Sequence, residues 1–110
     1  MKKDPLIFID YILECIELIE KYIKGKNKQD FLNSQLLQDG IIRRIEIIGE
    51  AVKNLPEEFK KLHESIPWKE IVGMRDIITH KYFGIDLELT WEVLDKELPF
   101  LKQDILKLKK

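Results

Sequence analysis

Residues 75–82, RDIITHKY, combine an arginine, a histidine and a tyrosine within eight positions. Arg75 can hold phosphate oxygens with its planar guanidinium, and the imidazole of His80 can take up or release a proton near neutral pH. Cleavage of RNA by its own 2'-hydroxyl needs these two abilities and no metal ion. Asp76, one turn before His80, is placed to hold the imidazole ring and favour its protonated form. This segment is therefore the candidate catalytic site.

The spacing sets a geometric condition on that site. In a helix, Arg75 and Tyr82 are seven residues apart and share a face, whereas Arg75 and His80 are five apart and lie roughly 140° around the axis from each other. Two copies of the helix that meet across a two-fold axis can bring the Arg and the His together. The alternative is structural: Arg75 and Asp76 as surface ion-pair residues, His80 as a helix-end cation and Tyr82 as an aromatic residue at the core edge.

Length and composition exclude several classes of protein. The chain has 110 residues, so a single domain over 1–110 is expected. With 45% hydrophobic and 35% charged residues it is too apolar to be disordered, and five glycines and four prolines supply too few turns for an all-β protein. A net charge of -1 gives no general attraction to nucleic acid or membranes. A phosphate ligand must therefore be held by a local cluster.

Metal and membrane binding find little support in the sequence. Cys15 is the only cysteine, and with two histidines it leaves too few ligands for a zinc site. No apolar run approaches the ~18 residues of a membrane span, and the acidic residues within the first apolar stretch indicate a mature helix rather than a signal peptide. We expect a cytoplasmic protein that needs no cofactor.

The elements that must position the candidate site read as helices. Asp4 can cap a first helix over about 5–24, which Gly25 is placed to end. Two adjacent apolar stripes cover more than half of this helix, so it is either a central helix or one that turns its second stripe to another subunit. After the polar connector GKNKQD, a second long helix spans about 34–54. Gly40 lies inside it and indicates a close helix approach.

The second half of the chain predicts further helices. Pro56 opens a short helix, and Pro67 opens a longer segment that contains the candidate site and ends before Gly84. Asp86 caps a last helix with apolar residues at alternating spacings of four and three, and Pro99 should kink it or split it in two. The pattern as a whole predicts an all-α bundle of four or five helices.

Four residues outside the motif at 75–82 are further candidates, and three of them have two interpretations. Arg43 and Arg44, the remaining arginines, are possible cleft contacts, although Arg44 has apolar helical neighbours and either snorkels to the surface or reaches a polar cleft. Glu50 either orients an arginine in the cleft or makes structural hydrogen bonds. Trp68 is either an anchor of the core or a platform for stacking bases.

The motif and its flanking segments resemble those of a known protein family. Arg75, His80 and Tyr82 match the Arg-x4-His-x-Tyr motif of the HepT-like toxins, a branch of the HEPN superfamily. The segments RRIEIIGEAVKNLPEEF and IPWKEIVGMRDIITHKYFGIDLELTWEVLDKELPFL also look like that family. The resemblance covers most of the chain, and IIGEA, PW and FGID make it more specific than the motif alone.

The resemblance implies a homodimeric helical bundle with the motifs in an interface cleft. It also implies metal-independent RNA cleavage by Arg75 and His80, with the chain as the toxin of a type VII toxin–antitoxin pair. Tyr82 takes the place of the tyrosine that a nucleotidyltransferase antitoxin of the MNT type adenylylates. The added phosphate would compete with RNA by charge and bulk.

One position departs from the family pattern. Asp76 stands where Asn is most common, and its carboxylate either raises the pKa of His80 or weakens RNA binding by repulsion. Two rival functions stay open: a noncatalytic subunit that binds a nucleotide or presents substrate to the nucleotidyltransferase, and an assembly protein whose motif only joins the dimer.

Overall fold

The computed structural model describes residues 4–79 and 86–109, and these form helices without any strand. The elements are α1 (Pro5–Ile23), α2 (Lys28–Leu32), α3 (Gln35–Asn54), α4 (Glu57–Leu62), α5 (Trp68–Thr79), α6 (Leu87–Glu92), the π-helical segment η1 (Val93–Glu97) and α7 (Leu98–Leu108). The expected all-α bundle is thus confirmed. Over this described part of the chain, no helix has both the length and the apolar character needed to cross a bilayer.

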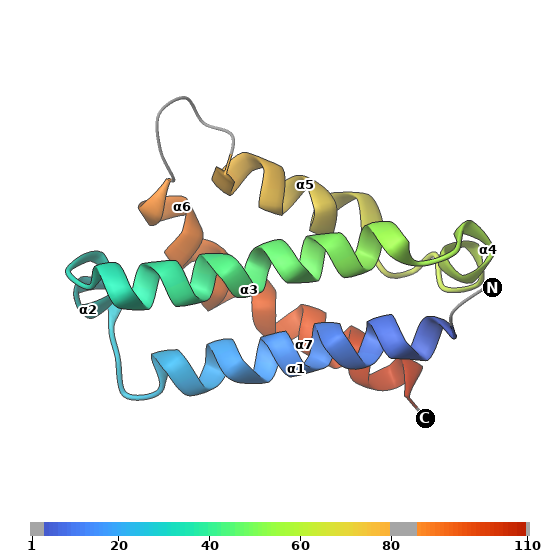
Figure 1. Ribbon diagram of the computed structural model, residues 1–110, viewed down its shortest axis with the longest axis horizontal. Coiled ribbons are helices and arrows are strands. Elements are labelled where there is room, and N and C mark those ends of the chain that lie inside the picture. Colours follow the sequence, from blue (N-terminus) through green and yellow to red (C-terminus); the bar gives the residue numbers. More distant parts are fainter. Residues whose placement is uncertain (1–3, 80–85, 110) are drawn as a thin grey trace.

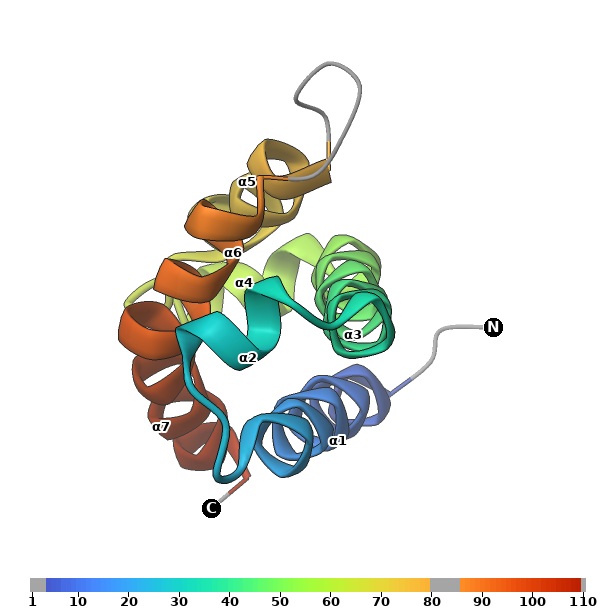
Figure 2. The same ribbon diagram turned by 90° about the vertical axis from the view of Figure 1, so that its left-hand side faces the viewer.

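Helix α3 is the centre of the arrangement. It runs antiparallel to α1, and α5 lies along its other side (Figure 1). The α6–η1–α7 rod covers the bundle from behind and reaches from α5 down to α1 (Figure 2). The core between these elements consists mainly of isoleucine and leucine, with Ile9, Ile16, Ile41, Ile48 and Ile105 fully buried. The segment that carries the candidate site therefore begins on a helix fixed to the middle of the fold.

Helix α1 begins and ends as the sequence indicates. The Asp4 carboxylate accepts a hydrogen bond from the Leu6 amide at 2.9 Å and caps the first turn. Gly25 follows the helix with a φ of 73°, a backbone conformation that glycine adopts without steric cost. An ion pair between Lys102 and Glu20, at 2.8 Å, joins α7 to α1.

The second apolar stripe of α1 is covered mostly by other parts of the same chain, and it consists of Phe8, Tyr11, Cys15, Leu18 and Tyr22. Cys15 is buried, while Tyr22 is half-buried and lies so near α3 that a methyl group at Gly40 would be 3.5 Å from its ring. The close approach predicted at Gly40 is confirmed. Tyr11, which is 53% exposed, is the residue of this stripe that remains open to solvent. Most of the second stripe of α1 is therefore covered by other helices of the same chain.

The connector before α3 differs from expectation because it contains a helix, α2. Asn27 and Asp30 form a capping box, in which each side chain accepts the backbone N–H of the other at 2.9 Å. Phe31 is fully buried and meets the Trp91 ring at a centroid distance of 5.6 Å. This polar-looking segment is helical because one aromatic side chain anchors it to α6.

The last helix is interrupted near Pro99, as predicted, and the interruption is a π-helical segment. Proline has no amide hydrogen and cannot continue the regular ladder. The N–H of Leu98 donates to the carbonyl of Val93, five residues earlier, which widens the turn. At the start of this rod, the Asp86 carboxylate accepts from the Leu89 amide at 3.0 Å and confirms the predicted cap.

Candidate functional site

The start of α5 is fixed to the core by Trp68. Its side chain is 8% exposed, and the indole N–H donates to the carbonyls of Lys60 and His63 at 3.2 and 3.1 Å. The ring also lies against Phe59, with the centroids 6.4 Å apart. Because the side chain is buried and the polar edge of the indole is hydrogen-bonded inside the protein, Trp68 is a core anchor. The alternative of a base-stacking platform does not fit this burial.

The predicted site residues occupy the second half of α5 and the segment after it. Arg75 lies in α5, four residues after the buried Ile71, and Asp76 follows it. His80 and Tyr82 fall outside the described residues. The roles assigned to Arg75, His80 and Tyr82 therefore stay predictions. The structure describes the helices on either side of residues 80–85 and the contacts that hold them.

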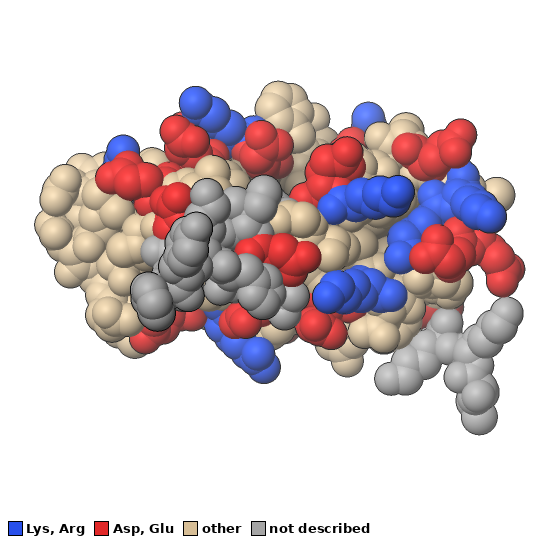
Figure 3. Space-filling view, turned by 90° about the horizontal axis from the view of Figure 1, so that it is seen from above, with Lys and Arg blue, Asp and Glu red and all other residues tan. Residues whose placement is uncertain are grey.

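A cavity of about 440 Å³ opens beside Asp76 between α3, α4 and α5. Its wall contains three lysines, Lys60, Lys61 and Lys69, and its other charged residues are Glu57, Glu64 and Asp76. The two signs are interspersed over the face that carries α5 (Figure 3). The lysines of this cavity can contact individual phosphates. Because acidic residues lie among them, the cavity lacks the strong positive potential that would attract nucleic acid of any sequence. The adjacent lysines of PEEFKK were a signal for it that the sequence reasoning passed over.

Helix α6, which follows the site segment, is also held by specific contacts. Thr90 is fully buried, and its hydroxyl donates to the Asp86 carbonyl at 2.7 Å. Together with the Asp86 cap, this bond fixes the first turn of α6 directly after residues 80–85. Lys28 of α2 also forms an ion pair with Glu88. Both ends of the segment therefore emerge from anchored helices.

Of the possible cleft contacts on α3, Arg44 lies toward α1. Burial raises the pKa of the Cys15 thiol, and the charge of Arg44 and its hydrogen bond to the sulfur oppose that shift, with a smaller contribution from Arg43. Arg44 is half-buried, and its Nε atom has no hydrogen-bond partner in the described part of the chain. Arg43 and Glu50 are exposed. Arg44 thus lies against α1 with part of its side chain exposed, and both interpretations of it, snorkelling to the surface and reaching a polar cleft, stay open.

Comparison with known proteins identifies the family. The sequence matches the family described as "Ribonuclease HepT-like" over residues 12–108. It is 43% identical over 110 residues to "Probable ribonuclease HepT" of Thermococcus cleftensis, and the alignment covers 100% of both chains. The chain belongs to the HepT-like ribonuclease family. This membership confirms the resemblance given by the motif and its flanking segments.

Two further relatives show the same relationship. The chain is 43% identical over 103 residues to "Putative RNase TTE0752" of Caldanaerobacter subterraneus subsp. tengcongensis, covering 94% of this chain and 92% of that protein. It is 59% identical over 108 residues to "Gamma-glutamylcyclotransferase and putative RNase MJ0434" of Methanocaldococcus jannaschii, covering 98% of this chain but 49% of that protein. The chain thus spans about half the length of the M. jannaschii relative. No solved structure matches.

Proposed function

We propose that this chain is a metal-independent endoribonuclease that acts as the toxin of a type VII toxin–antitoxin pair. The observation that carries the proposal is the family match over residues 12–108, which includes the Arg-x4-His-x-Tyr spacing of Arg75, His80 and Tyr82. Relatives that match over nearly their full length carry ribonuclease names. The anchored flanks of the segment, α5 and α6, support a site that is held in a defined place.

The proposed reaction uses the 2'-hydroxyl of the RNA itself. His80 exchanges protons with the reacting oxygens: the 2'-oxygen loses its proton and attacks phosphorus, the bond from phosphorus to the 5'-oxygen breaks, and the leaving 5'-oxygen gains a proton. Arg75 stabilises the negative charge that develops on the phosphate oxygens. The products are a 2',3'-cyclic phosphate and a 5'-hydroxyl end. Asp76 holds the imidazole and favours its protonated form.

We further propose that the site is shared between two subunits. Arg75 and His80 are five residues apart, and on one straight helix they would lie roughly 140° apart around the axis. A homodimer in which Arg75 of one subunit works with His80 of the other removes this difficulty. Tyr82, next to this cleft, is the proposed acceptor for an AMP group. An MNT-type nucleotidyltransferase would join its phenol oxygen to the α-phosphate of ATP and release pyrophosphate, which places a negative charge beside Arg75.

The cleavage test uses the purified protein with a labelled RNA in EDTA, and mass spectrometry of the RNA ends. We expect cyclic phosphate ends, and a loss of at least about 100-fold in rate in His80→Ala. His63→Ala is the matched control, because His63 is the other histidine of the chain. Its ring packs against Phe59, with the two ring centroids 4.7 Å apart. Intact RNA with a folded, dimeric protein would favour the noncatalytic nucleotide-binding subunit instead.

Mixing two inactive variants tests the shared site. If each site takes Arg75 from one subunit and His80 from the other, a mixed dimer of Arg75→Ala and His80→Ala has one intact site of two. Random exchange of subunits then restores about a quarter of the wild-type rate. If both residues act within one subunit, the mixture stays inactive. Dimer formation by each variant is checked first by sedimentation.

Modification of Tyr82 is tested by intact mass after co-expression with an MNT-type nucleotidyltransferase. We expect a mass increase of whole AMP units that disappears in Tyr82→Phe and persists in Tyr11→Phe, since Tyr11 is an exposed tyrosine on α1. An increase that survives in Tyr82→Phe would assign the modification to another residue.

A further inference from the structure

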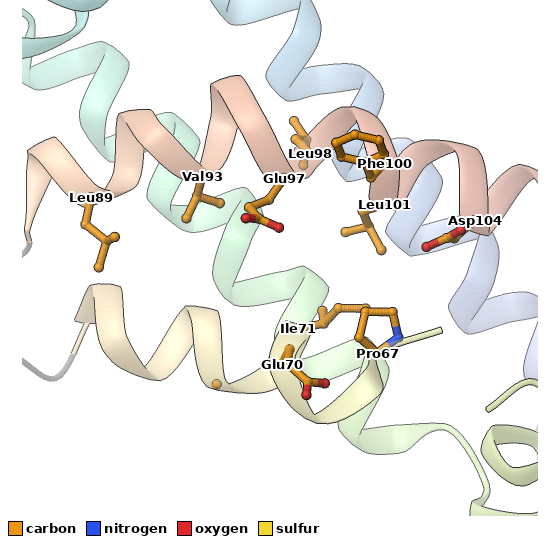
Figure 4. A pocket seen from close by; sticks show the side chains of 11 residues that line it. Pro67, Glu70, Ile71, Leu89, Val93, Glu97, Leu98, Phe100, Leu101 and Asp104 are labelled. Carbon is orange, nitrogen blue, oxygen red and sulfur yellow. The ribbon is translucent and has the colours of Figure 1, made fainter. Parts of the chain in front are cut away.

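A groove of about 410 Å³ separates α5 from the α6–η1–α7 rod, on the side of α5 away from the cavity at Asp76. Leu89, Val93 and Leu101 point from the rod toward α5, and Ile71 and Pro67 line the other side (Figure 4). The volume falls within the range of about 300–1,000 Å³ that is usual for ligand pockets. The groove is therefore large enough to accept several side chains of another molecule.

The mouth of the groove keeps an aromatic side chain in water. Phe100 lines it and is 69% exposed. Large apolar side chains at the edge of an apolar groove are typical of binding surfaces. The π-helical segment contributes to this surface, because Val93 and Glu97 at its two ends both line the groove. Such π-helical turns inside α-helices are frequent at functional sites.

The charged residues around the groove are all acidic. Glu70, Glu97 and Asp104 line it, and no lysine or arginine does so among the residues that the structure describes. Within that same part of the chain, none of the three carboxylates has an ion-pair or hydrogen-bond partner. Figure 4 shows the Glu97 carboxylate directed into the space between the helices. The rim therefore presents negative charge that the described residues do not neutralise.

This charge pattern selects among the possible occupants. RNA is excluded from the groove because its phosphates would face three carboxylates. A second copy that packs groove to groove is also disfavoured, because the two-fold axis would place like charges against one another. A segment with large apolar side chains can fill the apolar part of the groove, and flanking lysine or arginine residues can pair with the three carboxylates. An amphipathic helix presents these two kinds of residue on adjacent faces.

We propose that the groove between α5 and the α6–η1–α7 rod binds an amphipathic helix of a partner protein, with apolar side chains on the floor and basic residues facing Glu70, Glu97 and Asp104. The proposal does not depend on RNA cleavage. It assigns α5 two opposite surfaces, one facing the lysine-containing cavity at Asp76 and one facing the groove, and Gly73 lines both.

The test is selection from a displayed library of helical 16-residue peptides with random residues on all faces, using the full-length protein as target. We expect the selected peptides to carry apolar residues at helical spacing together with net positive charge. Synthetic versions labelled with a fluorophore then give dissociation constants by anisotropy. A failure to enrich basic amphipathic peptides would overturn the proposal.

Paired variants locate the binding. Phe100→Ser should raise the dissociation constant at least tenfold, and Glu97→Lys at least threefold at low salt and less at high salt. Leu62→Ser and Glu64→Lys are the matched controls, because Leu62 is 79% exposed and Glu64 is exposed, both near α4 and outside the groove. Equal weakening by Glu64→Lys would show unspecific charge attraction. Loss of self-association in Phe100→Ser would make a second copy the occupant. Either result contradicts the proposal, and circular dichroism confirms that the exposed substitutions leave the fold intact.

Discussion

Replacing Gln38 with leucine is expected to destabilise the protein, although leucine is apolar and of similar size. Gln38 is 8% exposed, and its side-chain amide donates to the Phe31 carbonyl at 3.0 Å and the Leu32 carbonyl at 3.1 Å. Loss of the donor costs about 0.5–1.5 kcal/mol at the Phe31 carbonyl, which still accepts the Ser34 N–H at 3.3 Å, and about 1 kcal/mol at the partly buried Leu32 carbonyl. The added apolar burial returns about 1 kcal/mol. The free energy of unfolding should fall by about 0.5–1.5 kcal/mol.

Urea denaturation followed by circular dichroism measures this change. Gln35→Leu is the matched control: Gln35 is an exposed glutamine of the same helix whose amide donates to Asp39 at 2.9 Å, and its loss should change the free energy of unfolding by less than about 0.5 kcal/mol. Gln38→Glu should cost more than Gln38→Leu at pH 7, because a carboxylate would face two carbonyl oxygens. A Gln38→Leu protein as stable as the wild type, or a control that loses as much, would refute the reasoning.

The other expected outcomes concern backbone conformation, capping and ionisation. Gly40→Ala should raise the free energy of unfolding by about 0.5–1 kcal/mol, since the added methyl fits at 3.5 Å from Tyr22, whereas Gly25→Ala should lower it by about 1–2 kcal/mol because φ is 73° there; urea denaturation measures both. Asp86→Ala should cost about 1 kcal/mol through loss of the cap, and hydrogen exchange should show faster opening at the start of α6. Burial raises the folded-state pKa of the Cys15 thiol above its ordinary 9.0, so the thiol ionises in the unfolded chain at a lower pH than in the folded protein. The stability that the neutral, buried thiol contributes is therefore complete below pH 9 and is lost as the pH rises through the folded-state pKa. The stability difference between wild type and Cys15→Ala should therefore narrow from pH 8 to pH 10, and a constant difference would contradict it.

Local rules on the sequence predicted the framework well. Asp4 and Asp86 accept the amide hydrogen bonds expected of capping residues, and Ser34 accepts one from Leu37 at 3.1 Å at the start of α3. These bonds join residues two or three positions apart, so they can be predicted from the local sequence. Pro99 interrupts the last helix for an equally local reason.

Features that depend on distant contacts were missed. Helix α2 has a polar sequence, and its stability comes from Phe31 packing on Trp91, sixty residues away, and from the amide of Gln38. Gln38 stands in the apolar register of α3, one turn before Ile41 and Ile42, and that misplaced polar residue was the available signal. The sequence predicted a polar connector here and missed the helix within it, because tertiary burial overrides local propensity. The site residues were proposed from spacing and family resemblance, and their roles await the mixing and cleavage experiments.

The arrangement of the flanking helices explains why α2 matters to the proposed site. Helix α5, which leads into the motif, is fixed to α3 and anchored by Trp68, while α6, which leads out of it, is fixed to α2 through Phe31, Trp91 and the ion pair of Lys28 with Glu88. Gln38 joins α2 to α3. The two ends of the motif are therefore held by one connected set of contacts centred on α3. A change at Gln38 loosens the exit without touching the entry, so it should reduce RNA cleavage more than its cost in global stability requires, whereas Gly40→Ala, between α1 and α3, should alter stability alone.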